Sequence, residues 1–232
     1  MAKLYMGFDA GTQSVKVAVY DENFNPVASH SLPTTLHYPQ PGWVQMNIDE
    51  FLNITVECMK KTVDAIKGKG YSPSDIVAVM GDGIICGICG VDKNGKAVTP
   101  YINYLDSRTQ ADVDAINAKN LDIWGRETGN PEANCMFPAM FARWFLANSE
   151  DFRQKGVKFV HNAPYILMNL AGLKGEDAFI DWGAMSGWGL GYKVEKKEWS
   201  DEQLDILGID KKYMPRILKP WDIVGGVSEE KA

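Results

Sequence analysis

The stretch GFDAGTQSVKVAVYD, residues 7–21, places a carboxylate, Asp9, and a polar turn between two segments that have the pattern of β-strands. Residues 3–8 predict a buried first strand, and after the turn Val15, Val17 and Val19 alternate with other residues, as in a strand with one buried face. Residues 26–32 predict a third strand beyond a second turn. The sequence therefore predicts an antiparallel meander at the start of the chain.

The first turn has the composition of an anion-binding loop. Gly11 allows a tight turn in which successive backbone N–H groups point at one anion. Thr12 and Ser14 add hydroxyl donors, and Lys16 adds a positive charge nearby. Asp9 at the strand end could hold Mg²⁺ through its waters, since Mg²⁺ keeps several waters and takes only one or two carboxylates. The plainer alternative is an ordinary strand end followed by a hairpin turn.

The composition narrows the class of protein. The chain has 232 residues, 45% hydrophobic and 23% charged, with a formal net charge of -6, which is typical of globular domains. The chain is acidic and has no run of Lys or Arg residues. This argues against a nucleic-acid partner, because neutralisation of the phosphates by basic side chains dominates the affinity of proteins for nucleic acids. The sequence has neither a signal-peptide pattern nor an apolar run near the roughly 20 residues that span a bilayer. We expect a soluble, cytoplasmic protein with no membrane partner.

The next part of the chain predicts one long helix. Asn47, with Glu50 three residues later, is typical of a helix start. Apolar residues then recur at spacings of three and four, and Gly68 marks the end. The residues of this apolar stripe are Leu52, Val56, Met59, Val63 and Ile66.

The remainder predicts further strands and then a helical region. Residues 76–80 predict a strand, and Asn94-Gly95 predicts a two-residue hairpin turn. The pattern becomes helical from Arg108, whereas residues 177–194 predict a return to glycine-rich β structure before a closing helix within residues 196–210. This order favours an α/β domain with a mixed sheet over a doubly wound parallel one.

The cysteines invite a separate interpretation. Cys86 and Cys89 form a CxxC, which suggests a zinc or redox site. Zinc would need a second Cys/His pair at close spacing, and the sequence offers none, since the three histidines are scattered (His30, His37 and His161). We therefore favour free thiols and ordinary surface or hydrogen-bonded histidines.

Several segments match the motifs of one family in their order along the chain. They are residues 7–21, QPGWVQMNIDEF (40–51), DKNGKAVTPYINYLDSRT (92–109), ARWFLANSEDF (142–152), PYILMNLAG (164–172) and residues 179–204. Together they resemble the FGGY carbohydrate kinases, which include xylulose, glycerol, gluconate and ribulose kinases. The resemblance implies the actin-like, ribonuclease H-like fold.

The resemblance also implies roles for individual residues. Asp9 matches the acid associated with Mg²⁺, and Asp181 matches the general base that takes the proton of the attacking sugar hydroxyl. The phosphate turn comprises Gly11, Thr12, Gln13 and Ser14, with Lys16 beside it, and ATP is the co-substrate. The residues expected to face the substrate are Asp82, Ile84, Ile85, Cys86, Tyr104, Asp106, Asp181 and Trp182. These roles agree with phosphoryl transfer, which depends on positioning and charge stabilisation.

Structural alternatives stand beside these roles. Asp181 could be a surface-turn acid, and Asp82 could be a simple turn acid. Trp182 and Trp188 lie in glycine-rich sequence that could line a sugar site, but tryptophans more often pack in a core.

One segment departs from the family pattern. Where xylulose kinases typically carry Ser-Gly-Gln-Met-His-Gly, residues 82–87 are Asp-Gly-Ile-Ile-Cys-Gly. Ile84 and Cys86 thus replace two polar residues, and apolar replacements remove the hydrogen bonds by which such a site recognises a substrate hydroxyl. Asp82 is a new acid that could accept sugar hydroxyls instead. A small sugar or polyol is the expected substrate, with a pentulose such as xylulose favoured.

The chain length is the second departure. The family pairs this domain with a second one that supplies most of the adenosine site, so we expect residues 1–232 to be the N-terminal domain and the C-terminal kinase domain to be missing. The isolated chain should bind ATP weakly, and its kinase turnover should be negligible. The alternative is a non-catalytic domain that senses a sugar or binds a partner. Without the second domain, the chain would expose an apolar face of the cleft, so the formation of a homodimer remains an alternative.

Overall fold

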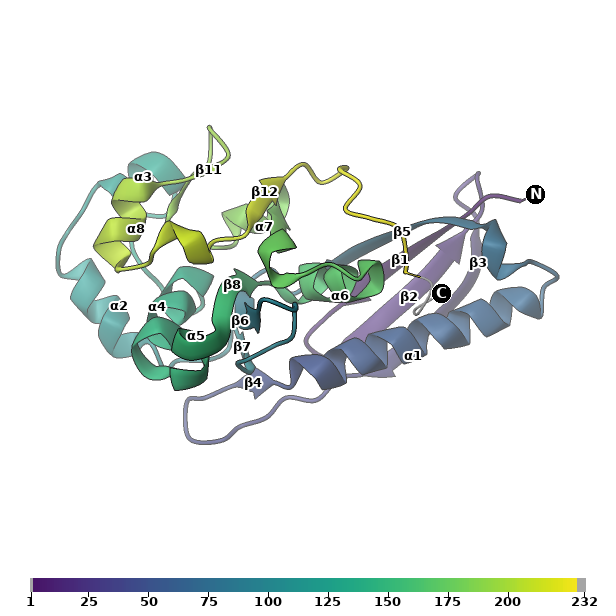
Figure 1. The fold of residues 1–232 in the computed structure, drawn as a ribbon, viewed down its shortest axis with the longest axis horizontal. Coiled ribbons are helices and arrows are strands. Elements are labelled where there is room, and N and C mark those ends of the chain that lie inside the picture. The colour runs from purple at the N-terminus through teal and green to yellow at the C-terminus, as the bar shows by residue number, and fades with distance from the viewer. Residues whose placement is uncertain (1, 229–232) are drawn as a thin grey trace. The chain divides into compact units, whose positions relative to one another are not determined.

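The computed structural model describes residues 2–228, which form two compact units (Figure 1). Of the described residues, the first unit comprises 2–36 and 47–84, and the second comprises 37–46 and 85–228. Each unit has its own four-stranded sheet.

The sheet of the first unit contains the predicted meander. Strands β1 (Leu4–Ala10), β2 (Ser14–Tyr20) and β3 (Pro26–Pro33) pair antiparallel, and β5 (Ile76–Gly83) pairs parallel to β1, in the order β3-β2-β1-β5. The short helix η1 (Pro73–Asp75) leads into β5. The prediction of a mixed sheet is confirmed here.

Helix α1 (Ile48–Lys67) covers one face of this sheet and begins and ends where the sequence predicts. The Asn47 side chain accepts the N–H groups of Asp49 and Glu50, and Gly68 is the C-terminal cap. Such a cap contributes about 1 kcal/mol to helix stability. The buried face of α1 packs on β2 and β3, where the Cys58 thiol lies 4.0 Å from the carbonyl oxygen of Val15.

A close approach between β1 and β5 gives a test of this packing. Gly81→Ala should destabilise the first unit by about 1–3 kcal/mol through overpacking. A Cβ at Gly81 would lie 2.1 Å from Cζ of the buried Phe8 ring. The matched control is Gly7→Ala on β1, where a Cβ would meet nothing within 4 Å. Urea denaturation of both variants measures the difference, and equal stabilities would contradict the contact.

The sheet of the second unit is antiparallel. Its order is β4-β7-β6-β8, with β4 (Gln45–Met46), β7 (Tyr101–Asn103), β6 (Gly87–Asp92) and β8 (Gly156–Val160). The predicted turn at Asn94-Gly95 follows β6, where Asp92 N donates to Lys96 O at 2.8 Å and Gly95 has φ +80°. Glycine adopts this backbone region without the steric strain that a side chain would cause, which explains why a glycine occupies this position of the turn.

Helices pack around a core of large apolar side chains in the second unit. The segments predicted to be helical contain α2 (Gln110–Asn117), α4 (Pro138–Asn148), α5 (Glu150–Lys155), α6 (Asn162–Ala171), η2 (Gly175–Asp177) and α8 (Asp201–Leu207). The short helix η3 (Lys211–Tyr213) lies beyond them and was not predicted. Helix α3 (Ile123–Thr128) was not predicted, because six residues are too few to show a helical repeat. The aromatic rings of Phe152 and Phe159 stack at 4.2 Å at the centre of this core.

The prediction of β structure for residues 177–194 is wrong in its middle part. Strand β9 (Phe179–Asp181) is followed by the short helix α7 (Trp182–Ser186), and within residues 177–194 β structure returns only in β10 (Tyr192–Lys193). Its partner β11 (Glu198–Trp199) lies at the start of the segment predicted as the closing helix, which begins only at Asp201. Strand β12 (Arg216–Leu218) pairs parallel to β9. The physical reason is the Asp181 side chain, which accepts backbone N–H groups and so starts a helical turn.

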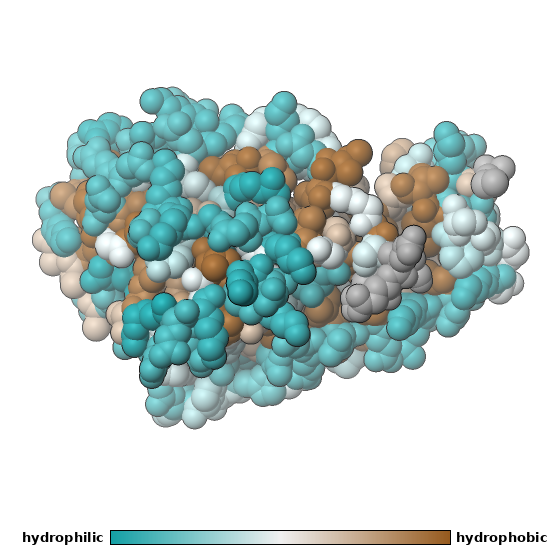
Figure 2. Space-filling view, in the orientation of Figure 1, coloured by the Kyte–Doolittle hydropathy of each residue, from teal (hydrophilic) through white to brown (hydrophobic). Residues whose placement is uncertain are grey.

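One face of the molecule is largely polar. Hydrophilic residues cover much of the face seen in Figure 2, with hydrophobic residues in smaller patches between them. Within residues 2–228, no helix has the length and apolar character needed to cross a membrane.

Candidate functional site

The predicted phosphate turn joins β1 to β2, and Thr34 donates hydrogen bonds to carbonyl oxygens of this turn. Gly11 N donates to Ser14 O at 3.1 Å, which closes the turn. Thr34 donates its N–H to Gln13 O at 3.1 Å and its hydroxyl to Thr12 O at 2.6 Å. In a planar trans peptide the C=O of one residue and the N–H of the next point in opposite directions. The N–H groups of Gln13 and Ser14 therefore point away from Thr34, as an anion-binding turn requires.

A row of charged residues crosses the same sheet beside this turn. Asp9 on β1 is the register partner of Lys16 on β2 and of Asp82 on β5. Lys16 Nζ donates to Asp9 Oδ2 at 3.2 Å, and both side chains are half-exposed or more. Asp82 is exposed and accepts the N–H of Gly83 at 2.7 Å. Two candidate carboxylates thus lie on neighbouring strands, which the sequence did not reveal because the register joins segments about seventy residues apart.

Asp181 is held by the helix that it caps. Its Oδ1 accepts the N–H of Gly183 at 2.7 Å and of Ala184 at 3.1 Å. No hydrogen bond to its Oδ2 is found within residues 2–228. One oxygen is therefore fixed by backbone donors, and the other is the candidate proton acceptor.

Two tryptophans follow Asp181 and have different surroundings. Trp182 is partly exposed, meets the edge of Trp221 at 5.5 Å and has Lys197 Nζ 4.9 Å from its ring centroid. Trp188 is fully buried in the core, as the structural alternative predicted. Trp182 thus stays a candidate for substrate contact.

The segment that departs from the family pattern is divided between the two units, and Ile85 and Cys86 lie near α7. Ile84 is buried in the first unit, whereas Ile85 and Cys86 belong to the second. Cys86 Sγ donates to Gly187 O at 3.3 Å, and burial raises the pKa of the Cys86 thiol, which keeps it protonated. Gly187 is the C-terminal cap of α7, so Ile85 and Cys86 lie one short helix from Asp181.

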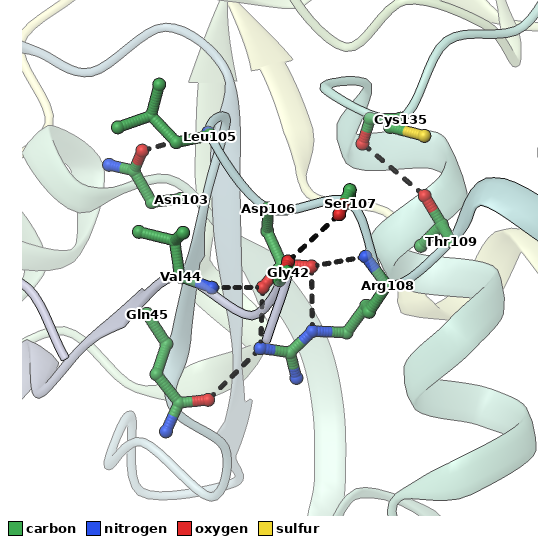
Figure 3. Close-up of polar contacts among 10 residues, drawn as sticks. All are labelled: Gly42, Val44, Gln45, Asn103, Leu105, Asp106, Ser107, Arg108, Thr109 and Cys135. Atoms are coloured by element: carbon green, nitrogen blue, oxygen red, sulfur yellow. Dashed lines mark hydrogen bonds and ion pairs between the residues drawn. The ribbon is translucent and has the colours of Figure 1, made fainter. Parts of the chain in front are cut away.

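Asp106 is buried in a polar cluster (Figure 3). Its Oδ2 accepts Val44 N at 2.6 Å and Arg108 Nη2 at 2.8 Å, and its Oδ1 accepts Arg108 N at 2.8 Å and Nε at 2.9 Å. Arg108 also donates to Gln45 Oε1 at 3.2 Å. The side-chain exposures of Arg108 and Asp106 are 1% and 0%. This geometry fits a structural role for Asp106 rather than the predicted substrate contact, because both its oxygens are occupied and shielded.

The neighbours of this cluster complete its description. The Arg108 guanidinium lies 3.8 Å from the Trp43 ring centroid and 4.9 Å from that of Trp144. Tyr104, two residues before Asp106, is 37% exposed and is available for contact. None of the four cysteines forms a disulfide, and no group of three or more His, Cys, Asp or Glu residues that could hold a metal occurs among the described residues.

Comparison with known proteins identifies the family. The model of the FGGY family of carbohydrate kinases, N-terminal domain, matches residues 4–232. The chain is 28% identical to glycerol kinase 2 of Thermotoga maritima over 98% of its own length and 46% of that relative. It thus spans about half the length of the curated relatives it matches.

Solved structures share the fold. A glycerol kinase from Plasmodium falciparum with ADP superposes with a TM-score of 0.89 at 22% identity, covering 99% of this chain and 46% of that one. A ligand-bound xylulose kinase from Lactobacillus acidophilus gives 0.83 at 23%, covering 99% and 44%. These likenesses confirm the predicted actin-like α/β fold. The chain belongs to the FGGY family of carbohydrate kinases and corresponds to the N-terminal domain of that family.

Proposed function

We propose that this chain is the sugar-binding half of an ATP-dependent carbohydrate kinase, which transfers the γ-phosphoryl group of ATP to a hydroxyl of a small sugar or polyol. The observation that carries the proposal is the placement of Asp181 in a chain of this family. Backbone donors fix its Oδ1, so Oδ2 is oriented to accept the proton of the attacking hydroxyl. The hydroxyl oxygen then bonds to the γ-phosphorus as the bond to the ADP oxygen breaks.

The first unit supplies the proposed phosphate and metal functions. The turn of residues 11–14 offers the N–H groups of Gln13 and Ser14, and Lys16 adds positive charge. Asp9 is an exposed carboxylate, and oxygen ligands of this kind suit Mg²⁺. Mg²⁺ would neutralise charge on the phosphates. A cytoplasmic location is part of the same proposal, since ATP is available there.

The substrate is proposed by class. The relatives named above include a glycerol kinase and a xylulose kinase, so a short polyol and a ketose are both candidates, and a pentulose such as xylulose is the first to test. Turnover is proposed to need a C-terminal domain like the one that makes up the other half of the relatives. The second candidate is a non-catalytic domain that senses a sugar or binds a partner, which the replacement of two polar family residues by Ile84 and Cys86 favours.

A ligand panel on this chain tests the proposal. We expect one class of alcohol, among ketopentoses, aldoses, glycerol and gluconate, to raise the melting temperature selectively. A ligand at a hundred times its dissociation constant stabilises by about 2.7 kcal/mol, which corresponds to roughly 5–10 °C at this length. Asp181→Ala should reduce the shift. A flat panel, with and without Mg-ATP, would contradict sugar binding by this chain.

A further inference from the structure

The C-terminal end of α7 has used its hydrogen-bond donors internally. Ser186 donates its hydroxyl to Gly183 O at 2.6 Å, and Tyr192 donates its hydroxyl to Ser186 O at 2.8 Å. The Cys86 thiol donates to Gly187 O at 3.3 Å. Three side chains that could have donated a hydrogen bond to a substrate hydroxyl therefore donate to the backbone instead.

Ile85 presents apolar surface at the same place. Its side chain is 50% exposed and lies over Gly187, where a Cβ would come within 2.4 Å of Ile85 Cγ1. The glycine is thus what lets Ile85 sit against the α7 backbone. At a rise of about 1.5 Å per residue, the five residues of α7 place this surface about 8 Å along the helix axis from the Asp181 cap. That separation is comparable with the length of a small polyol.

We infer that the acceptor alcohol carries a deoxy or C-methyl group at the end remote from the reacting hydroxyl, and that Ile85 is the residue that selects it. The inference rests on the proposed function, because it takes Asp181 as the base. A hydroxyl pressed against Ile85 would lose bonds to water on that side, and the hydrocarbon side chain of Ile85 offers neither a donor nor an acceptor in return. A methyl group there loses nothing and buries apolar surface.

The preference should be moderate in size. Apolar sites reject an added hydroxyl less strongly than polar sites reject a missing one, and the discrimination is about 10- to 100-fold. Matched pairs of alcohols that differ by one oxygen therefore give the sharpest test. Glycerol against propane-1,2-diol and xylulose against 1-deoxyxylulose are such pairs.

The experiment measures dissociation constants of both pairs for this chain by calorimetry, with and without Mg-ATP. We expect the deoxy member of at least one pair to bind about 10- to 100-fold more tightly. Ile85→Gln supplies a hydrogen-bonding side chain and should reverse the preference. Val77→Gln is the matched control, because Val77 on β5 is 54% exposed and Ile85 is 50% exposed.

The outcomes separate this inference from the proposed function. If the hydroxylated members bind more tightly, or Ile85→Gln and Val77→Gln behave alike, the inference is wrong while alcohol binding stands. If no alcohol of either kind binds with or without Mg-ATP, both the inference and the proposed function are contradicted for this chain.

Discussion

Asp181→Asn should lower phosphoryl transfer by about 10²- to 10⁴-fold, which is the usual contribution of a general base. The measurement uses a fusion of this chain to the C-terminal half of a relative such as the Thermotoga maritima glycerol kinase 2, since the chain matches 46% of that protein. Sugar affinity should change little, because the amide keeps the size and shape of the carboxylate. The loss should therefore fall on kcat rather than on KM.

The choice of asparagine separates chemistry from structure at this position. Asn and Asp are comparable N-terminal caps, so Asp181→Asn keeps an acceptor for the N–H groups of Gly183 and Ala184. Asp181→Ala removes the cap as well and should cost about a further 1 kcal/mol of stability. If the two variants lose transfer equally and only Asp181→Ala loses stability, the kinetic effect belongs to the lost base.

A second acid provides the control. Asp177 is four residues earlier, is partly buried like Asp181, and also accepts a backbone N–H, that of Lys174 at 3.0 Å. Asp177→Asn should leave transfer unchanged. Normal turnover in Asp181→Asn, or an equal loss in Asp177→Asn, would refute the assignment of Asp181 as the base.

The sequence predicted best the parts of the fold whose signals are local. The meander and α1 depend on alternation, on the cap at Asn47 and on the stop at Gly68, and all of these lie within one short window. Helix α7 was missed because its five residues are too few to show a helical repeat and because glycines lie within it and directly after it. The Asp181 side chain that starts it carries the only local signal, an acid just before the first helical residue.

The candidate site divides in the same way. The sequence could predict the candidate phosphate turn and its acid because these residues are contiguous, whereas the pairing of Asp9 with Asp82 depends on sheet register. The cluster around Asp106 joins residues 43–45 to residues 106–108, and no local pattern reports such a contact. Asp106 was consequently grouped with the substrate residues, although its bonds lie inside the protein.

Arg108→Ala should destabilise the second unit by about 3–5 kcal/mol, because it leaves a buried carboxylate without its counter-ion. Asp106 would keep only the N–H groups of Val44 and of residue 108 itself. The variant also removes the guanidinium that lies 3.8 Å from the Trp43 ring centroid. Hydrogen exchange at the Val44 amide gives a local readout of this opening, alongside urea denaturation.

Two further variants decide what the buried pair contributes. Arg108→Lys keeps the charge but loses the bidentate contact to Asp106, so the stability of this variant should lie between that of the wild type and that of Arg108→Ala. Lys155→Ala breaks an exposed pair with Asp151 on α5 and should stay close to wild type. Removing both partners, as in Asp106→Leu with Arg108→Met, should recover much of the loss, because no unpaired charge remains buried. If that double variant is no more stable than Arg108→Ala, hydrogen bonds to Asp106 other than those from Arg108 hold this cluster together.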